Sequence, residues 1–303
     1  MKIYVDKTKV KREDLELVTE LFFTYPLLSQ QAQNHINNNR FWESGIFDNI
    51  EGLEYADEVN CDYFALPFKF KDSKEDRFLE LLDKSRHYGK KLICLNNDDF
   101  GGDYNIPDDI VLFRTSFYAS QRKPNEFAFP VFVPDINKHS KGFSENVSIG
   151  FCGDSNRPIR KEALNVLKKS NIKVNHDEIF SFFQNPYEDK KTGRDRFFKN
   201  LQENIFILTP RGCGNFSYRF YETMCFGRIP VFVNTDCVLP FENLIDYKNE
   251  IVFVEENELE KLPEKIMEYC NKYDLIERQQ RCRDIWSKYL SSSSFAKHIE
   301  TLL

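Results

Sequence analysis

The chain has 303 residues, with 42 lysines and arginines against 48 aspartates and glutamates, so its net charge is −6. A charge of this sign excludes a general electrostatic attraction to nucleic-acid phosphates or to anionic lipids. Hydrophobic residues make up 41% and charged residues 30% of the chain, which is typical of a globular protein long enough for two domains. No apolar run approaches the roughly 20 residues that cross a bilayer.

Short β-rich runs alternate with amphipathic stretches, the pattern of parallel sheets covered by helices. In the first half, strands are predicted at 2–5, 62–66, 91–95, 110–114 and 127–133, with helices at 13–23 and 74–88. In the second half, strands are predicted at 147–152, 172–174, 204–208, 229–233 and 251–254, with helices at 158–169, 194–201, 216–226 and 258–273. Two further helices, 277–289 and 294–302, close the chain. The sequence therefore predicts an α/β protein with doubly wound sheets.

The polar stretch 135–145 lies between two predicted strands and marks the boundary between the halves. We expect a first domain at 1–140 and a second at 141–275. The eight cysteines show neither a Cys-x-x-Cys motif nor a zinc-type spacing with histidine, which favours reduced thiols in a cytoplasmic protein.

One segment combines a buried strand, a glycine-containing loop and a helix. The strand ends at Pro210, the loop contains Gly212, and Asn215 is placed to cap the helix that follows. Backbone N–H groups of such a loop can approach an anion, and the helix N-terminus adds about half a positive charge. On the helix, Arg219 is suited to diphosphate oxygens and Glu222 to a ribose diol. The alternative is a surface ion pair between these two side chains, three residues apart.

The pattern continues beyond this helix. Pro-x-Gly is followed by Ser-x-Arg-x-x-Glu, then Gly-x-Ile-Pro-Val, then a carboxylate shortly before Leu-Pro-Phe. These positions are Pro210, Gly212, Ser217, Arg219, Glu222, Gly227, Ile229–Val231, Asp236 and Leu239–Phe241. In order and spacing they resemble the exostosin family of glycosyltransferases (GT47-like). Two weaker elements agree in order, Cys61–Phe68 and Phe151-Cys152-Gly153 with Ile159-Arg160.

The resemblance implies a GT-B fold, in which two doubly wound, Rossmann-like domains face a central cleft. It also implies an inverting glycosyltransferase whose second domain holds a nucleotide sugar, most often a UDP-sugar. The acceptor would be a growing glycan, free or lipid-linked, in surface polysaccharide or glycoconjugate synthesis. By analogy, residues 276–303 would cross back to the first domain. With no membrane anchor in the sequence, we expect a cytoplasmic form, peripheral to the membrane where the acceptor is lipid-linked.

The sequence departs from the family pattern in three places. Thr223 stands where alanine is usual, Arg228 where cysteine is usual, and Tyr247 where a tryptophan often follows Leu-Pro-Phe. We expect Arg228 to face solvent at the end of its helix.

No Asp-x-Asp motif occurs, so we expect neither the chelated metal of GT-A transferases nor any other cofactor. Arginines can neutralise the leaving diphosphate instead, and Arg157, Arg160, Arg211 and Arg219 are available. The predicted donor-binding residues are Gly153, Arg160, Arg211, Gly212, Asn215, Ser217, Arg219 and Glu222.

Inversion needs a base for the acceptor hydroxyl, and the first domain should supply it. Asp98 and Asp99 directly follow a predicted strand, although such clusters are also ordinary turn residues. Glu43 and His35 are alternatives, and the neighbouring Phe41 and Trp42 are suited to stacking on a sugar. The sequence leaves the base open among these.

Two other functions compete with the exostosin reading. One is a fucosyltransferase-like GT-B enzyme that uses a GDP-sugar, although the Tyr-x-Thr-Glu-Lys run of those enzymes is not matched. The other is a non-catalytic GT-B domain that binds glycan or nucleotide, for which loss of Arg219 or Glu222 would be the mark. Both residues are present.

Overall fold

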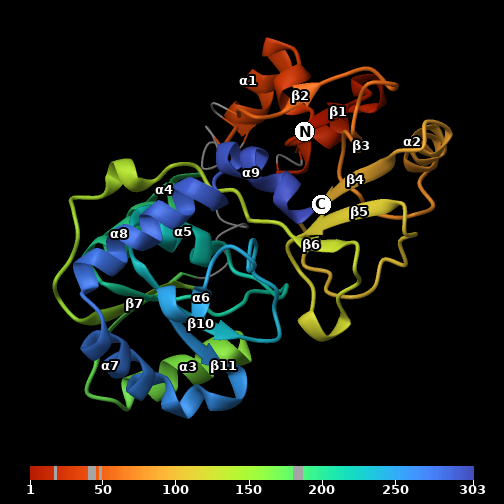
Figure 1. Ribbon diagram of the computed structural model, residues 1–303. Coiled ribbons are helices and arrows are strands. Elements are labelled where there is room, and N and C mark those ends of the chain that lie inside the picture. The colour runs from red at the N-terminus through yellow and green to blue at the C-terminus, as the bar shows by residue number, and fades with distance from the viewer. Residues whose placement is uncertain (17–18, 40–45, 48–49, 180–186) are drawn as a thin grey trace. The chain divides into compact units, whose positions relative to one another are not determined.

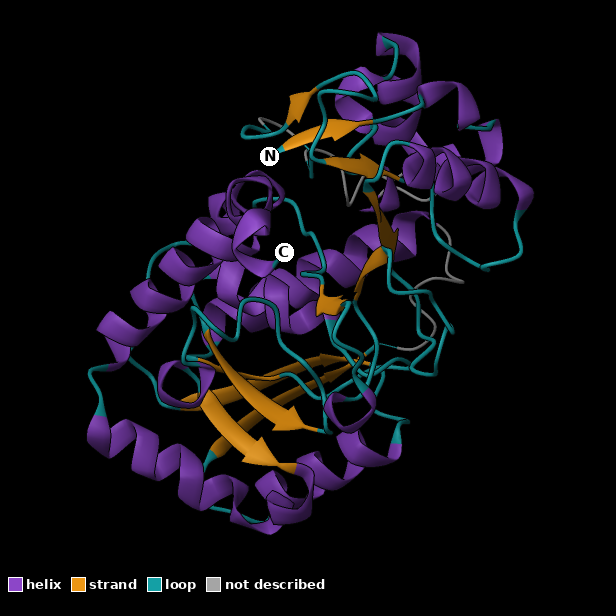
Figure 2. Ribbon diagram, turned by 45° about the vertical axis from the view of Figure 1, so that its right-hand side comes forward, coloured by secondary structure: helices purple, strands orange, loops and turns teal. Residues whose placement is uncertain are grey.

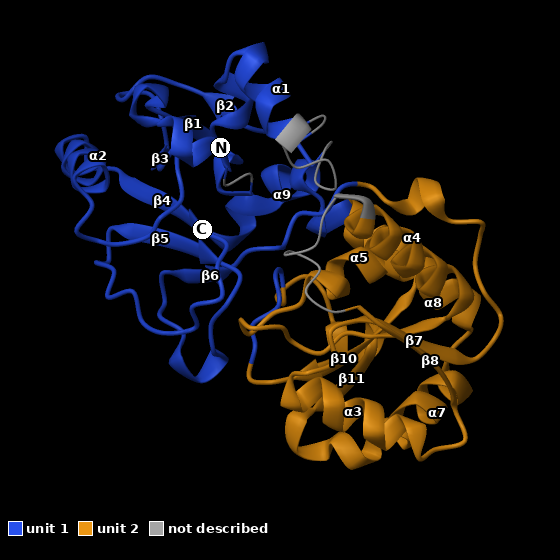
Figure 3. Cartoon of the chain, turned by 180° about the vertical axis from the view of Figure 1, so that it is seen from behind, with its two compact units in different colours: residues 1–134, 237–241, 288–303 blue, residues 135–236, 242–287 orange. Residues whose placement is uncertain are grey.

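The computed structural model describes residues 1–16, 19–39, 46–47, 50–179 and 187–303. The chain forms two compact units, each with its own sheet (Figures 1 and 3). The first unit comprises 1–134, 237–241 and 288–303, and the second comprises 135–236 and 242–287. Whereas the sequence suggested a division at 140/141, the first unit ends at Pro134. Residues 288–303, rather than all of 276–303, group with the first unit.

The first unit contains a parallel sheet in the order β2-β1-β3-β4-β5-β6. Its elements are β1 (Lys2–Tyr4), α1 (Gln30–Asn39), β2 (Glu54–Tyr55), β3 (Tyr63–Ala65), α2 (Asp76–His87), β4 (Lys91–Asn96), β5 (Ile110–Arg114), β6 (Glu126–Ala128) and α9 (Ser292–His298). The helix predicted at 13–23 is wrong, since this stretch contains short 3₁₀ helices at Arg12–Glu16 and Thr19–Leu21. Neither β2 nor α1 was predicted.

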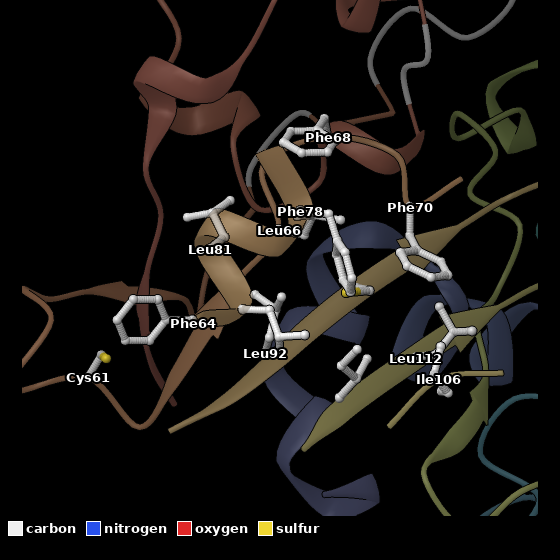
Figure 4. Packing of buried hydrophobic residues seen from close by; sticks show 13 residues of the cluster. Cys61, Phe64, Leu66, Phe68, Phe70, Phe78, Leu81, Leu92, Ile106 and Leu112 are labelled. Atoms are coloured by element: carbon white, nitrogen blue, oxygen red, sulfur yellow. The ribbon is translucent and has the colours of Figure 1, made fainter. Parts of the chain in front are cut away.

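Helix α2 covers one face of this sheet. Its Phe78, Leu81 and Leu82 are buried against apolar side chains of β3, β4 and β5 (Figure 4). Leu112 of β5 belongs to this cluster, whereas the next residue, Phe113, lies 5.5 Å from the ring of Phe295 in α9. Because successive side chains of a strand point to opposite faces, α2 and α9 cover opposite faces of the sheet.

The ring of Phe295 lies at the centre of an aromatic cluster in the first unit. It is surrounded, with centroid separations of 5.2 to 5.8 Å, by Phe22, Phe113, Phe129, Phe132 and Phe241. These rings are buried and most pairs are tilted or edge-to-face, the geometry that aromatic quadrupoles favour. These six of the 29 phenylalanines therefore form part of the core of the first unit.

The second unit contains a parallel sheet in the order β11-β10-β9-β7-β8. Its elements are β7 (Ser148–Gly153), α3 (Pro158–Lys168), β8 (Lys173–Glu178), α4 (Tyr187–Glu203), β9 (Phe206–Leu208), α5 (Tyr218–Phe226), β10 (Ile229–Asn234), α6 (Tyr247–Glu250), β11 (Val252–Glu255), α7 (Leu262–Lys272) and α8 (Leu275–Ile285). Helices α3 and α7 lie on one face of the sheet and α4, α5 and α8 on the other (Figures 1 and 2).

Local sequence signals explain the ends of several of these helices. Pro158 opens α3, where its missing N–H costs no hydrogen bond. Asp274 caps α8 by accepting from the amides of Ile276 and Glu277. Gly227 ends α5 in the left-handed conformation, with φ at +74°. Such signals are why these helices could be predicted to within a few residues.

The two sheets share one topology. In each, the first strand lies between the second and the third: β1 between β2 and β3, and β7 between β8 and β9. The connections that leave β1 and β3 run in opposite directions, and so do those that leave β7 and β9. In such folds this opens a crevice at the carboxyl ends of the strands, where ligands bind. The predicted fold class is confirmed: the chain consists of two parallel-sheet α/β domains of the GT-B kind.

Candidate functional site

The predicted donor-binding residues gather where the strand order of the second sheet reverses. Gly153 ends β7, and Arg160 lies in the helix that follows it. Arg211 and Gly212 lie in the loop after β9, and Arg219 is in α5, which follows that loop. The two connections that flank the crevice between β7 and β9 thus carry most of the predicted set.

Arg219 reaches back from α5 to the end of β7. Its Nη2 donates to the carbonyl of Cys152 at 2.8 Å, and its guanidinium carbon lies 4.4 Å from the centre of the Phe151 ring. A Cβ atom on Gly153 would collide with the same Nη2. The absence of a side chain at Gly153 therefore allows the guanidinium to lie against the strand end.

Arg160 ties the two connections together. Its Nη1 donates to the carbonyl of Asp154 at 2.7 Å and its Nε to the carbonyl of Arg211 at 3.0 Å. A Cβ at Gly212 would lie 3.4 Å from Nη2 of Arg160, so this glycine is also closely approached. Arg160 thereby fixes the loop after β9 relative to the loop after β7.

Nearby carboxylates act on the arginines of this crevice only at a distance. Within the described residues, Arg160, Arg211 and Arg219 form no salt bridge, and the Nε atoms of Arg211 and Arg219 are buried without a hydrogen bond. Burial, together with the like charge of Arg160, lowers the pKa of Arg219 to about 10, although Glu222 acts in the opposite direction. Burial also lowers the pKa of Arg160. Crowded guanidinium groups with unused donors are suited to an anion such as a diphosphate.

Glu178, at the end of β8, forms its hydrogen bonds with residues other than these arginines. Glu178 accepts from the amide and the hydroxyl of Ser155 at 2.7 and 2.6 Å, and from His176 at 2.8 Å. Burial alone would raise the pKa of Glu178, but the hydrogen bonds from Ser155 and His176 outweigh it and lower this pKa. This carboxylate stabilises the loop after β7, and its effect on Arg160 is only a longer-range electrostatic one.

The loop before α5 differs in detail from the prediction. Ser217, and not Asn215, is the N-cap residue, and its side chain makes no capping hydrogen bond. Asn215 is buried and accepts from the hydroxyl of Thr235 at 2.5 Å, which ties the loop to the end of β10. The amide of Gly212 donates to the carbonyl of Phe216 at 2.9 Å, so this N–H is not available to an anion.

Glu222 pairs with Arg194, which was not among the residues predicted for this site. Its Oε1 accepts from Nη1 of Arg194 in α4, and both side chains are more than four-fifths buried. The surface pair of Arg219 with Glu222 is not formed among the described residues. Arg194 lies on the predicted helix but is far from the motif in sequence, so only the packing of α4 beside α5 could reveal it.

Arg228 is fully buried, so the expectation that it faces solvent is wrong. Its guanidinium donates to the carbonyls of Leu201, Gly227 and Gly142 at 2.8 to 2.9 Å. Leu201 and Gly227 lie at the C-terminal ends of α4 and α5, where unpaired carbonyls carry partial negative charge. Arg228 directly precedes β10 and thus lies at the amino-terminal end of this strand, whereas the arginine crevice lies at the carboxyl ends of the strands. Its role is structural.

The proposed bases lie in the first unit. Asp98 accepts from Asn96 Nδ2 at 2.9 Å, from the amide of Phe100 at 3.1 Å and from the Tyr104 hydroxyl at 2.8 Å. Asp99 is exposed, and its carbonyl accepts from Ser116 at 3.2 Å. These contacts organise the loop after β4.

The remaining base candidates come from the stretch around α1. Glu43, Phe41 and Trp42 lie outside the described residues. His35 is partly exposed, and its Nε2 lies 3.4 Å from Oε1 of Glu16. Within the described part of the chain, no group of three or more His, Cys, Asp or Glu side chains is placed to hold a metal ion.

Residues 108–270, more than half of the chain, match the family model of the exostosin GT47 domain. The chain belongs to the exostosin GT47 family of glycosyltransferases. A "Probable glucuronosyltransferase 47 A" from Physcomitrium patens is 36% identical over 101 residues, which cover 33% of this chain and 22% of the relative. An "Exostosin-1 homolog" from Caenorhabditis elegans is 29% identical over 113 residues, covering 35% and 29%. The matched part thus spans less than a third of either relative.

The chain is also similar to a solved glycosyltransferase from Rickettsia africae. The TM-score is 0.43 and the identity 12%, over 99% of this chain and 97% of that one. Among the helices of the described residues, none is both long and apolar enough to cross a membrane.

Proposed function

We propose that this chain transfers a sugar from a UDP-sugar to a growing glycan, with inversion at C1 and without a metal ion, in surface polysaccharide or glycoconjugate synthesis. The observation that carries the proposal is the group of arginines at the β7/β9 crevice, in which the Nε atoms of Arg211 and Arg219 are buried without a hydrogen-bond partner. Family membership supplies the reaction class.

The donor's diphosphate would lie against Arg219, Arg211 and Arg160. As the acceptor oxygen attacks C1, the bond from C1 to the diphosphate oxygen breaks and its electron pair leaves with the diphosphate. Fixed guanidinium groups stabilise this charge as it develops, which is the task that a metal performs in other transferases. The hydroxyl of Ser217, the N-cap residue of α5, would donate to the same group.

Glu222 would recognise the ribose. Its Oε1 is held by Arg194, and its Oε2 forms no hydrogen bond to a described residue, so one oxygen remains for a sugar hydroxyl. A uridine nucleotide is proposed because the family most often uses UDP-sugars. The names of the relatives make UDP-glucuronic acid the first donor to test. We propose the cytoplasm as the site of reaction, since all eight cysteines are free thiols.

The test is a thermal-shift titration with UDP, GDP, CMP and ADP, which needs no acceptor. A ligand that binds only the folded state raises stability by RT ln(1 + [L]/Kd). A shift with UDP alone is expected. A shift with GDP alone would assign a GDP-sugar instead, and no shift with any nucleotide would contradict the transferase proposal.

A further inference from the structure

The first unit repeats the topology of the second, and its own strand-order reversal lies between β1 and β3. The connection that leaves β1 carries Glu20, and the connection that leaves β3 carries Lys69. Because ligands of such sheets bind at the carboxyl ends of the strands beside this reversal, charged groups here are candidates for contact with a substrate.

Glu20 and Lys69 meet at that edge. Nζ of Lys69 lies 3.5 Å from Oε1 of Glu20 and 3.6 Å from Oδ2 of Asp98. The amide of Asn97, directly after β4, donates to the same oxygen of Glu20 at 3.3 Å. Glu20 is thus fixed at the end of β4 although it comes from a different connection of the chain.

One oxygen of Glu20 is uncommitted. Only 4% of this side chain is exposed, and 13% of Lys69. Oε2 of Glu20 makes no hydrogen bond to another described residue, in contrast to Oε1. Oδ1 of Asn96, the last residue of β4, is buried without a partner. A buried polar atom without a partner is rare, so Oδ1 of Asn96 indicates room for a donor such as a hydroxyl group at the carboxyl end of β4.

Asp98 is less suited to proton transfer than Glu20. Its two oxygens already accept from Asn96, Phe100 and Tyr104, and Lys69 lies nearby. A carboxylate whose lone pairs are occupied must give up a hydrogen bond before it can take a proton. Its contacts hold the loop in place, which is a positioning role.

We propose that Glu20 is the catalytic base that takes the proton of the acceptor hydroxyl, with Lys69 and Asn97 as the positioning residues that hold its carboxylate. This inference rests on the proposed function. In the step, the acceptor O–H bond breaks and its proton passes to Oε2 of Glu20. The acceptor oxygen forms a bond to C1, and the diphosphate leaves with the electron pair of the old C1–O bond. The protonated carboxyl then returns its proton to solvent.

The electrostatics of the group agree with this role. Burial raises the pKa of Glu20 to about 7, although Lys69 and the amide of Asn97 lower it. Two charged side chains lie near this carboxyl. Lys69 contacts it directly, and Asp98 is the second carboxylate beside Nζ of Lys69. A base whose pKa lies near the working pH combines a large deprotonated fraction with sufficient basicity.

The test uses the full chain and follows UDP release from a panel of UDP-sugars, with water as the acceptor, between pH 5 and 9. We expect the wild-type rate to rise through about pH 7. Glu20→Gln should lower the rate by about a hundredfold or more and remove the pH dependence. Lys69→Met should move the rise to higher pH, because the cation that lowers the pKa of Glu20 is gone. Nucleotide affinity, measured by thermal shift, should be unchanged in both.

The matched control is Asp14→Asn. Asp14 is buried to a similar degree, lies in the same connection between β1 and β2, and pairs with Arg77 of α2 at 2.7 Å. It should lose stability and keep the wild-type pH profile. A Glu20→Gln variant with the wild-type rate and the wild-type pH dependence would overturn the assignment of Glu20 as the base, and would leave the transferase proposal intact. A wild type that binds UDP yet releases none from any UDP-sugar also overturns the base, whereas one that binds no nucleotide overturns the proposed function itself.

Discussion

Gly153 and Arg219 occupy complementary space at the end of β7. The backbone of Gly153 has a φ of +148°, a conformation that residues with side chains rarely adopt, and a Cβ atom there would collide with Nη2 of Arg219. The hydrogen bond from this nitrogen to the carbonyl of Cys152 depends on that space. The position of the central arginine in the proposed donor site is therefore set by a glycine from a different part of the chain.

Gly153→Ala should weaken UDP binding. The new methyl group displaces Arg219 from the Cys152 carbonyl, and a charge-assisted hydrogen bond is worth about 1.5 to 3 kcal/mol, so the affinity should fall roughly ten- to a hundredfold. Isothermal titration calorimetry measures this. Gly142→Ala is the control, because Gly142 also has a positive φ, +104°, and nothing within 4 Å of the added atom. Equal affinities in the two variants would contradict the role of Gly153.

Glu222→Ala should separate ribose recognition from phosphate recognition. Since Glu222 is assigned to the ribose, the variant should bind UDP about tenfold or more weakly and bind inorganic pyrophosphate as the wild type does. Arg194→Ala should behave in the same way, because Arg194 holds Oε1 of Glu222. Competition of both ligands against a fluorescent nucleotide gives the two affinities. A parallel loss for pyrophosphate would place Glu222 at the phosphates instead.

Arg228→Ala should destabilise the chain without affecting the nucleotide. The substitution leaves the carbonyls of Leu201, Gly227 and Gly142 without their donors, which should cost about 3 kcal/mol or more. Urea denaturation measures the loss. UDP affinity of the folded variant should stay within about twofold of wild type. A stable variant with weakened UDP binding would show that Arg228 acts at the donor site after all.

The buried Glu20 predicts a pH dependence of stability. Its pKa is raised from 4.5 to about 7 in the folded chain, so its contribution to stability is fully present below pH 4.5 and is lost as the pH rises through 7. Relative to wild type, Glu20→Gln should therefore gain about 3 kcal/mol of unfolding free energy between pH 4.5 and 7.5. Urea denaturation of both proteins across this range tests it, and a constant difference would show that the pKa is not raised.

The sequence was sufficient for the fold class and for the motif around α5. The apolar runs at 147–152 and 229–233 are typical of strands buried on both faces, which is why the fold class could be predicted. Gly212, Arg219 and Glu222 lie close together along the chain, which is why the motif could be recognised. The order of strands within each sheet could not be read in this way, because pairing between β7 and β9 joins segments more than fifty residues apart. That pairing brings Gly153 to Arg219.

The partners of the site residues were hidden for the same reason. Arg194 meets Glu222 through the packing of two helices, and Glu20 meets Lys69 across two connections of the first sheet. The exposure of Arg228 was predicted wrongly because a charged residue after a helix is ordinarily exposed. Two of the carbonyls that bind its guanidinium, those of Leu201 and Gly142, are distant in sequence, and no local pattern indicates them.

Calorimetric titration of UDP into the wild type and Arg219→Ala tests the central claim, that the arginines at the β7/β9 crevice bind the diphosphate of a nucleotide sugar. Arg281→Ala is the matched control, since Arg281 is an arginine of the same unit whose partner is Glu250. The wild type and the control should bind UDP with equal affinity, and Arg219→Ala should bind roughly ten- to a hundredfold more weakly. Equal affinity in all three proteins, or no binding by the wild type, would contradict the assignment.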